Sequence, residues 1–220
     1  MAEFQDDGVE ILLRRSRLLV YLLIAGLVAT AMFFLFELSE ITGFWVVDVN
    51  DPFNSPLGII YGITGLTHSL IYFVTVIVFS MWIHRAAHNI VTADIDGFSY
   101  TPGWAVGWFF IPFANLFKPF QAMRQIWNAS HGASGFLNEG SQTVTIWWSA
   151  WLVVTISGNI SLRLTVAATD AEQLMWATQI GAISSVASFL LFPAAIRLVK
   201  DITRAQTEYL QINALAERFA

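Results

Sequence analysis

The sequence contains no cysteine in its 220 residues, which excludes disulfide bonds, thiolate metal sites and cysteine nucleophiles. Charged residues are also scarce: they make up 12% of the chain, compared with roughly a quarter of a soluble domain. No basic patch or motif typical of nucleic-acid binding is present, so no nucleic-acid partner is expected. Hydrophobic residues, in contrast, make up 56% of the chain and include 9 tryptophans and 18 phenylalanines. This composition excludes a soluble globular domain and predicts an integral membrane protein whose surroundings are the lipid bilayer.

Four apolar runs account for most of this hydrophobicity. Each is close to or above the about 20 residues that a helix needs to cross the hydrocarbon core. The predicted spans cover about residues 18–36, 57–82, 143–166 and 175–199. Small side chains four apart in the fourth span predict a close approach of helix backbones; they are Gly181, Ser184, Ser185 and Ser188. Residues 37–56 are acidic, contain two X-Pro turn signals and are predicted to form a loop.

The first apolar run could instead be a signal peptide. Basic residues precede it, and Ala29-Thr30-Ala31 resembles a cleavage site. However, apolar residues continue on both sides of that triplet, and the run is longer than the about 7–15 residues usual in a signal peptide. An uncleaved transmembrane helix is therefore favoured.

Residues 102–130, between the second and third spans, are predicted to form an insert that does not cross the membrane. The apolar stretch from Gly103 to Leu116 is too short for one crossing at about 1.5 Å per residue, and Pro112 interrupts it. A re-entrant hairpin or a segment lying at the membrane surface fits this length better. The end of the insert has the apolar face of an interfacial helix, formed by Phe120, Met123, Ile126 and Trp127.

The tail, residues 200–220, is predicted to be a cytoplasmic amphipathic helix that lies on the bilayer or pairs with another helix. Its apolar positions recur at helical spacing. They are Ile202, Ala205, Tyr209, Ile212, Ala216 and Phe219.

The distribution of basic residues favours four crossings over five. Lysine and arginine concentrate in the cytoplasmic loops of membrane proteins. With four crossings and a cytoplasmic N-terminus, ten basic residues lie inside and only Arg163 lies outside. If the insert crossed the membrane, five would lie inside and six outside. The sequence therefore predicts an all-α integral membrane protein that forms a single domain over residues 1–220, with four transmembrane helices and both termini in the cytoplasm.

A resemblance to a known family is carried by roughly residues 80–130. The chain there reads Trp82-x-x-Arg85-x-x-x-Asn89, then Tyr100-x-Pro102-Gly-Trp-Ala-Val-Gly-Trp108-Phe-Phe-Ile-Pro112-x-x-Asn115-Leu-x-x-Pro119, and closes with Ile126-Trp127. This pattern resembles the signature of the bacterial membrane family called domain of unknown function 4328. The resemblance implies a multi-spanning protein of the bacterial inner membrane, and it implies no activity.

The polar residues of this signature allow two interpretations. In the structural one, Arg85, Asn89 and Asn115 lock the insert to the helix bundle and satisfy the backbone groups that the break at Pro112 exposes. In the functional one, Arg85 joins two other cations in a site for an anion or a lipid headgroup. The other two cations would be Lys118 and Arg124. The structural interpretation is favoured, because a buried broken helix has many polar groups to satisfy.

Two histidines four residues apart, His84 and His88, could share a metal ion from one helix face. His131, Asp94 and Asp96 could approach from the same side. No third ligand stands at a fixed spacing and no HExxH motif is present, so two interfacial histidines are favoured over a metal site. No other cofactor is predicted.

Two polar residues lie within the predicted spans, where an ionisable group is by default a functional candidate. His68 is expected to be a neutral, hydrogen-bonded core residue on the same helix face as Tyr61, Thr64 and Tyr72, rather than a proton or ligand site. Asn159 is expected to form a hydrogen bond between helices.

Three functions remain open. The favoured one is a non-catalytic scaffold or accessory subunit that binds another membrane protein or a second copy of itself. The second is a small transporter or lipid-binding protein that uses the break at Pro112 as a gate. The third is a metal-dependent membrane enzyme, for which the sequence contains no catalytic motif.

Overall fold

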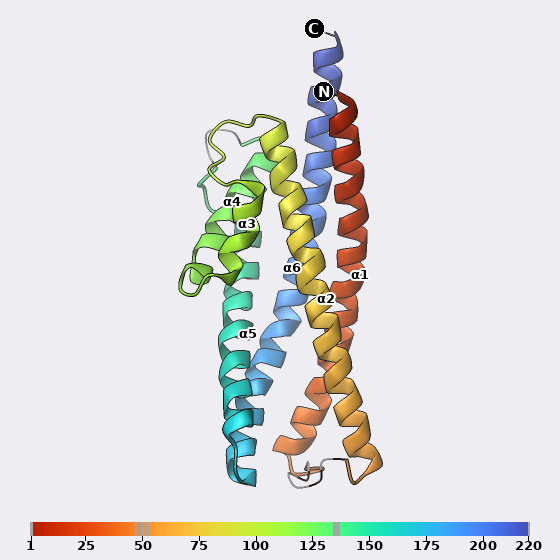
Figure 1. The fold of residues 1–220 in the computed structure, drawn as a ribbon, viewed down its shortest axis with the longest axis vertical. Helices are drawn as coiled ribbons and strands as arrows, with labels where there is room; N and C mark the ends of the chain where they lie inside the picture. Colours follow the sequence, from red (N-terminus) through yellow and green to blue (C-terminus); the bar gives the residue numbers. More distant parts are fainter. Residues whose placement is uncertain (1, 47, 49–50, 52, 134–136, 220) are drawn as a thin grey trace. The chain divides into compact units, whose positions relative to one another are not determined.

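The structure is a computed structural model that describes residues 2–46, 48, 51, 53–133 and 137–219, with the backbone alone at 2–6 and 209–219. The described residues form helices and connections, without a β-strand. In chain order the elements are α1 (Ala2–Ile41), α2 (Pro56–Thr92), α3 (Pro102–Gly107), the 3-10 helices η1 (Trp108–Phe110) and η2 (Ala114–Leu116), α4 (Lys118–Ser130), α5 (Gln142–Ala167) and α6 (Ala171–Phe219) (Figure 1).

Four of these helices, α1, α2, α5 and α6, are long and apolar enough to cross a membrane. This confirms the predicted all-helical class with four candidate spans. The helices extend beyond the predicted apolar runs, because a helix continues wherever its backbone bonds continue and does not stop at the edge of a hydrophobic stretch. α6 passes through Pro193 and includes the tail, so the tail is not a separate helix. The predicted apolar positions Tyr209, Ile212, Ala216 and Phe219 lie outside the residues whose side chains are described.

The chain divides into two compact units, and each long helix contributes to both. Unit 1 comprises Met1–Tyr21, Thr75–Trp148 and Ala194–Ala220. Unit 2 comprises Leu22–Val74 and Ser149–Pro193.

The core of unit 1 is built from large side chains that have almost no exposed surface. The aromatic ring of Phe79 stacks on Trp147 at 5.9 Å and lies beside Trp82 at 5.6 Å. Besides Trp82 and Trp147, the largest fully buried side chains of the unit are Leu12, Leu19, Ile83, Ile90, Met123, Ile126, Val144, Leu198, Ile202 and Gln206. They come from α1, α2, α4, α5 and α6, so burial of apolar surface holds these five helices together.

Helix α4 belongs to this core. The sequence predicted that its apolar face would lie at the membrane surface, but Met123 and Ile126 are 1% and 0% exposed and are covered by protein. Amphipathic periodicity shows only that one face avoids water, and here neighbouring helices cover that face.

The insert turns back on itself within unit 1. The side chain of Thr101 caps α3 by accepting a hydrogen bond from the backbone N–H of Trp104, and Pro102 occupies the first helical position. The chain then passes through η1, Pro112 and η2 before α4 begins. Figure 1 shows α3 and α4 side by side, with the two 3-10 helices at the tip of the turn.

Unit 2 is held partly by close contact of α5 with α6. The hydroxyl of Ser184 donates to the carbonyl of Val154 at 3.1 Å, and that of Ser161 donates to the carbonyl of Ala177 at 2.8 Å. A Cβ atom at Gly158 would lie only 3.3 Å from Ser184 Oγ. Small residues therefore let the two backbones approach, as the spacing of small residues in the fourth span predicted.

Candidate functional site

Three residues of the predicted signature lie on one face of α2, because they are separated by three and four positions. Trp82 is fully buried, and its indole N–H donates to Thr203 Oγ1 of α6 at 3.1 Å. Asn89 is 5% exposed, and its amide donates to Gln206 Oε1, also of α6, at 3.0 Å. Arg85 lies between them and faces α1. This face of α2 therefore packs against protein within unit 1.

Gln206 is the centre of a buried amide network and is 1% exposed. Its side-chain N–H groups donate to the carbonyl of Ala86 and to Ser130 Oγ, both at 3.0 Å. The hydroxyl of Ser130 in turn donates to the carbonyl of Ile126 at 2.6 Å. Together with the bond from Asn89, these contacts connect α2, α4 and α6. The sequence analysis did not single out Gln206, although its position four residues after Ile202 was a signal that it shares the inward face.

Arg85 connects α2 to α1. Its Nε donates to the carbonyl of Gly8 at 3.1 Å. A Cβ atom at Gly8 would collide with Arg85 Nη2 and would lie 2.9 Å from Asn89 Oδ1. The α1 backbone thus lies directly against these two side chains. Arg85 and Asn89 were expected to lock the insert, but they contact α1 and α6, and the insert joins the network through Ser130.

The remaining signature residues of the tip are spaced along the turn. The ring of Trp108 lies 4.8 Å from that of Trp104, and the ammonium group of Lys118 lies 5.7 Å from the Trp108 ring. Pro112 occupies the bend between η1 and η2. The backbone N–H of Asn115 donates to the carbonyl of Ile111 at 2.9 Å, across that bend.

On α4, the signature residues are a buried proline and a partly exposed tryptophan. Pro119 is at the start of the helix, where its missing N–H costs no hydrogen bond. Trp127 stacks on His131 with ring centroids 4.4 Å apart.

The three cations of the predicted anion site have separate partners. Arg85 bonds to Gly8, and Lys118 lies over Trp108. Arg124 donates from Nη2 to Asn138 Oδ1 at 3.4 Å and lies over the ring of Phe120 at 5.6 Å. Near Arg124, burial raises the pKa of the Tyr100 phenol, whose hydroxyl donates to Gln121 Oε1 at 3.3 Å. Each cation is thus fixed by its own neighbours.

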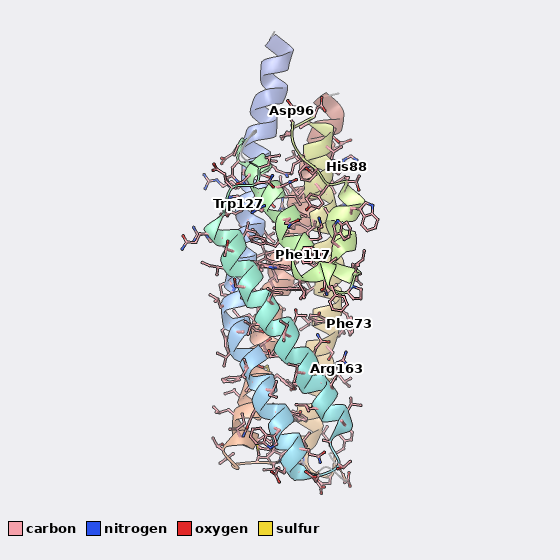
Figure 2. All side chains as sticks on the ribbon, turned by 90° about the vertical axis from the view of Figure 1, so that its left-hand side faces the viewer. Phe73, His88, Asp96, Phe117, Trp127 and Arg163 are labelled. Carbon is pink, nitrogen blue, oxygen red and sulfur yellow. The ribbon has the colours of Figure 1, made fainter. Side chains whose placement is uncertain are left out.

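The histidines predicted as a low-priority metal site are exposed. The ring centroids of His84 and His88 are 6.4 Å apart, and His88 Nδ1 shares a hydrogen bond with the hydroxyl of Thr92 at 3.1 Å. Figure 2 shows His88 and Trp127, the stacking partner of His131, on different sides of unit 1. Within the described part of the chain, no three metal-ligating side chains come together.

Of the two polar residues within the spans of unit 2, His68 bonds to another helix and Asn159 bonds within its own helix. His68 Nε2 shares a hydrogen bond with Thr30 Oγ1 at 3.1 Å, and its ring stacks on Phe33 at 5.7 Å. On the predicted inward face of α2, Thr64 is buried but Tyr72 is 58% exposed. Asn159 is exposed and donates to the carbonyl of Thr155 in its own helix at 2.7 Å, rather than to a second helix.

Two acidic residues have a different place from the one expected. The sequence analysis assigned Glu37 and Glu40 to a loop, but α1 continues to Ile41 and both side chains are buried, at 6% and 5% exposure. Their spacing in the sequence could have predicted this position, because Glu37 and Glu40 follow Phe33 at the helical spacing of the preceding span.

Comparison with known proteins assigns the chain to a family of unknown function. The family model described as "Domain of unknown function (DUF4328)" matches residues 58–204, which include the insert and most of α2 and α6. No curated protein and no solved structure matches the chain.

The first prediction concerns the amide network. Gln206→Ala should lower the free energy of unfolding by about 2–3 kcal/mol, because the buried amide of Asn89 and the hydroxyl of Ser130 lose their partner. The measurement is thermal unfolding of the purified protein in detergent. Gln142→Ala, at an exposed glutamine in unit 1, is the control and should change stability by less than about 0.5 kcal/mol. Equal effects of the two substitutions would refute the role of the network.

The second prediction concerns the contact between Gly8 and Arg85. Gly8→Ala should displace the guanidinium group and cost about 1 kcal/mol of stability. In the background of Arg85→Ala, the same substitution should cost much less, because the colliding atoms are gone. Gly103→Ala is the matched control, since a Cβ atom there meets no atom within 4 Å. If the Gly8→Ala effect is the same in both backgrounds, the contact does not exist.

Proposed function

The chain belongs to the DUF4328 family, and we propose that it is a non-catalytic scaffold or accessory subunit of a complex in the bacterial inner membrane. The observation that carries this proposal is how the signature residues use their polar groups. The indole N–H of Trp82 bonds to Thr203, the guanidinium group of Arg85 bonds to Gly8, and the amide of Asn89 bonds to Gln206. Side chains bonded in this way maintain the shape of a helix assembly and are not directed at a ligand.

In the proposed topology, both termini lie in the cytoplasm and the insert is re-entrant. Support comes from the charge distribution and from unit 1, in which α1 begins and α6 ends at the same end (Figure 1). The insert leaves α2 and returns to α5 on one side of that unit, as expected for a segment that turns back in the bilayer. Irregular backbone at membrane depth must have its polar groups satisfied by protein. The cap at Thr101 and the bond from Asn115 to Ile111 do this in the insert.

The surface proposed to meet the partner is the insert aromatic surface, which consists of the exposed apolar side chains of the tip. Phe113 is 82% exposed and Phe110 is 66% exposed. The other members are Trp104, Leu116 and Phe117. Aromatic side chains supply large contact areas at low entropic cost, which makes them frequent anchors in protein interfaces. The proposed partner is an apolar transmembrane helix of another protein or of a second copy of this chain.

A second candidate, lipid binding at the same surface, is favoured by the position of Lys118. Its ammonium group lies over Trp108, next to the insert aromatic surface. A cation at the edge of an aromatic patch is a typical arrangement at a membrane interface, where it meets lipid phosphate.

The third prediction tests the topology and uses the absence of native cysteines. His88→Cys, before the insert, and Glu139→Cys, after it, should both resist a membrane-impermeant maleimide in intact spheroplasts and react once the membrane is permeabilised. Asp170→Cys, between α5 and α6, should react in both conditions and serves as the control. If His88→Cys and Glu139→Cys react from different sides, the insert crosses the membrane and the topology is wrong.

The fourth prediction tests the scaffold function. Gentle extraction followed by native mass spectrometry should find the wild-type chain in a stoichiometric complex with a membrane protein or with itself. The double variant Phe110→Ser, Phe113→Ser should reduce this complex by about tenfold or more. Phe73→Ser, which changes a phenylalanine of α2 that is 63% exposed, is the control and should leave the complex intact. A wild-type monomer without a protein partner would contradict the scaffold function. A monomer carrying lipid that is lost in Lys118→Gln would favour the second candidate.

A further inference from the structure

Basic side chains of α1 and α2 meet in unit 1, at one end of the candidate spans. Arg15 lies shortly before the first predicted span, and its guanidinium group donates to the carbonyl of Met81, at the end of the second predicted span. Arg85, one turn further along α2, donates back to the carbonyl of Gly8. These bonds hold α1 and α2 side by side (Figure 1). The basic groups of the two helices are therefore kept at the same end of the spans.

The charged groups at this place act mainly on one another. Arg15 interacts electrostatically with Arg14, and His84 interacts with both Arg15 and Arg85. Asp7 offsets part of the charge of Arg85. No carboxylate among the described side chains has a comparable effect on Arg15 or His84. Because basic groups gathered in this way repel one another, the place favours an anion from outside the chain.

Arg15 and His84 have hydrogen-bond donors left for such an anion. Arg15 is half-buried, and the bond from its Nη1 to Met81 is its only hydrogen bond to a described residue, so Nε and Nη2 remain. His84 is exposed, and its ring forms no hydrogen bond to a described residue. Arg85 is bonded to Gly8 and contributes charge rather than contact. A guanidinium group already fixed by a backbone bond is well suited to bind a phosphate group.

The surface next to these donors, toward the spans, is apolar and exposed. Met81 and Ile77 lie on the same face of α2 as His84, at spacings of three and four. They are 43% and 60% exposed. On α1, Leu18 follows Arg15 by three positions and is 51% exposed. Donors for a phosphate group beside exposed apolar side chains fit an amphiphile whose head lies at the membrane surface and whose chains lie along the helices.

We propose that Arg15 and His84 bind the phosphate group of one anionic phospholipid, whose acyl chains lie on the adjoining apolar surface of α1 and α2. A zwitterionic headgroup carries an ammonium group that Arg14 and Arg85 repel, whereas a glycerol headgroup carries no such charge. The bound phosphate reduces the repulsion between the basic groups and so stabilises the contact of α1 with α2. The site goes beyond the scaffold function and is separate from the second candidate, because it uses neither the insert aromatic surface nor Lys118.

The fifth prediction tests this site. The full-length protein is delipidated in detergent and titrated with dioleoyl phosphatidylglycerol in mixed micelles, and bound lipid is counted by native mass spectrometry. We expect one tightly bound phosphatidylglycerol per chain and a rise in Tm of about 5 °C at a hundredfold excess over Kd. Dioleoyl phosphatidylcholine, which has the same chains, and sodium phosphate, which has none, should each produce less than about a third of this rise.

The variant Arg15→Gln should weaken the binding of phosphatidylglycerol by about tenfold or more, because the phosphate loses a charged donor. His84→Ala, a substitution at an exposed position that the fold does not depend on, should weaken it by about fivefold. Arg17→Gln, at an exposed arginine of the same helix, is the matched control. It should bind phosphatidylglycerol like the wild type.

Four outcomes would overturn the proposal. The first is a wild-type Tm that does not respond to phosphatidylglycerol, and the second is an equal response to phosphatidylcholine or to sodium phosphate. The third is equal weakening in Arg15→Gln and Arg17→Gln, which would indicate a general attraction of basic residues to anionic micelles. The fourth is loss of the bound lipid in Lys118→Gln but not in Arg15→Gln, which would place the lipid at the insert.

Discussion

The structure of unit 1 depends on the hydrogen bonds of one buried side chain, Gln206. In a low-dielectric interior an amide without partners is strongly unfavourable, so the position of Gln206 is acceptable only where each of its polar atoms is satisfied. The partners are Asn89 and the carbonyl of Ala86 on α2 and the hydroxyl of Ser130 on α4. The requirement also fixes the register of three helices, because sliding any of them by one residue would break the bonds. Apolar packing between helices is less selective, since similar side chains recur along each face.

The bonds of Gln206 give the signature of the family a structural meaning. Trp82, Arg85 and Asn89 are polar or amphipathic residues at positions where the helix meets α1 and α6, and their hydrogen-bonding groups are used there. The insert is joined to this assembly through Ser130 and through the buried face of α4. Its tip projects aromatic side chains away from the core. Unit 1 thus combines a fixed interior with an apolar surface, which is the combination that a docking subunit requires.

Unit 2 has a different chemical character. Its buried polar groups include two carboxylates, and these lie before residue 58, where the match to the family begins. The residues that face them on α5 and α6 lie within the match. The long helices α1, α2, α5 and α6 each contribute residues to both units.

The sequence by itself determined the helical class, the four candidate spans and the family, because hydrophobic length and the order of Trp, Pro and Asn residues are local properties of the chain. It also located the break in the insert, since Pro112 interrupts an apolar stretch that is too short to cross the membrane. Only the tertiary structure decided which faces are covered. Met123 and Ile126 pack on protein instead of lipid, Arg85 meets Gly8, and Glu37 and Glu40 are buried in α1 rather than exposed in a loop. These outcomes depend on which helices become neighbours, and periodicity within one helix carries no information about the identity of the neighbour.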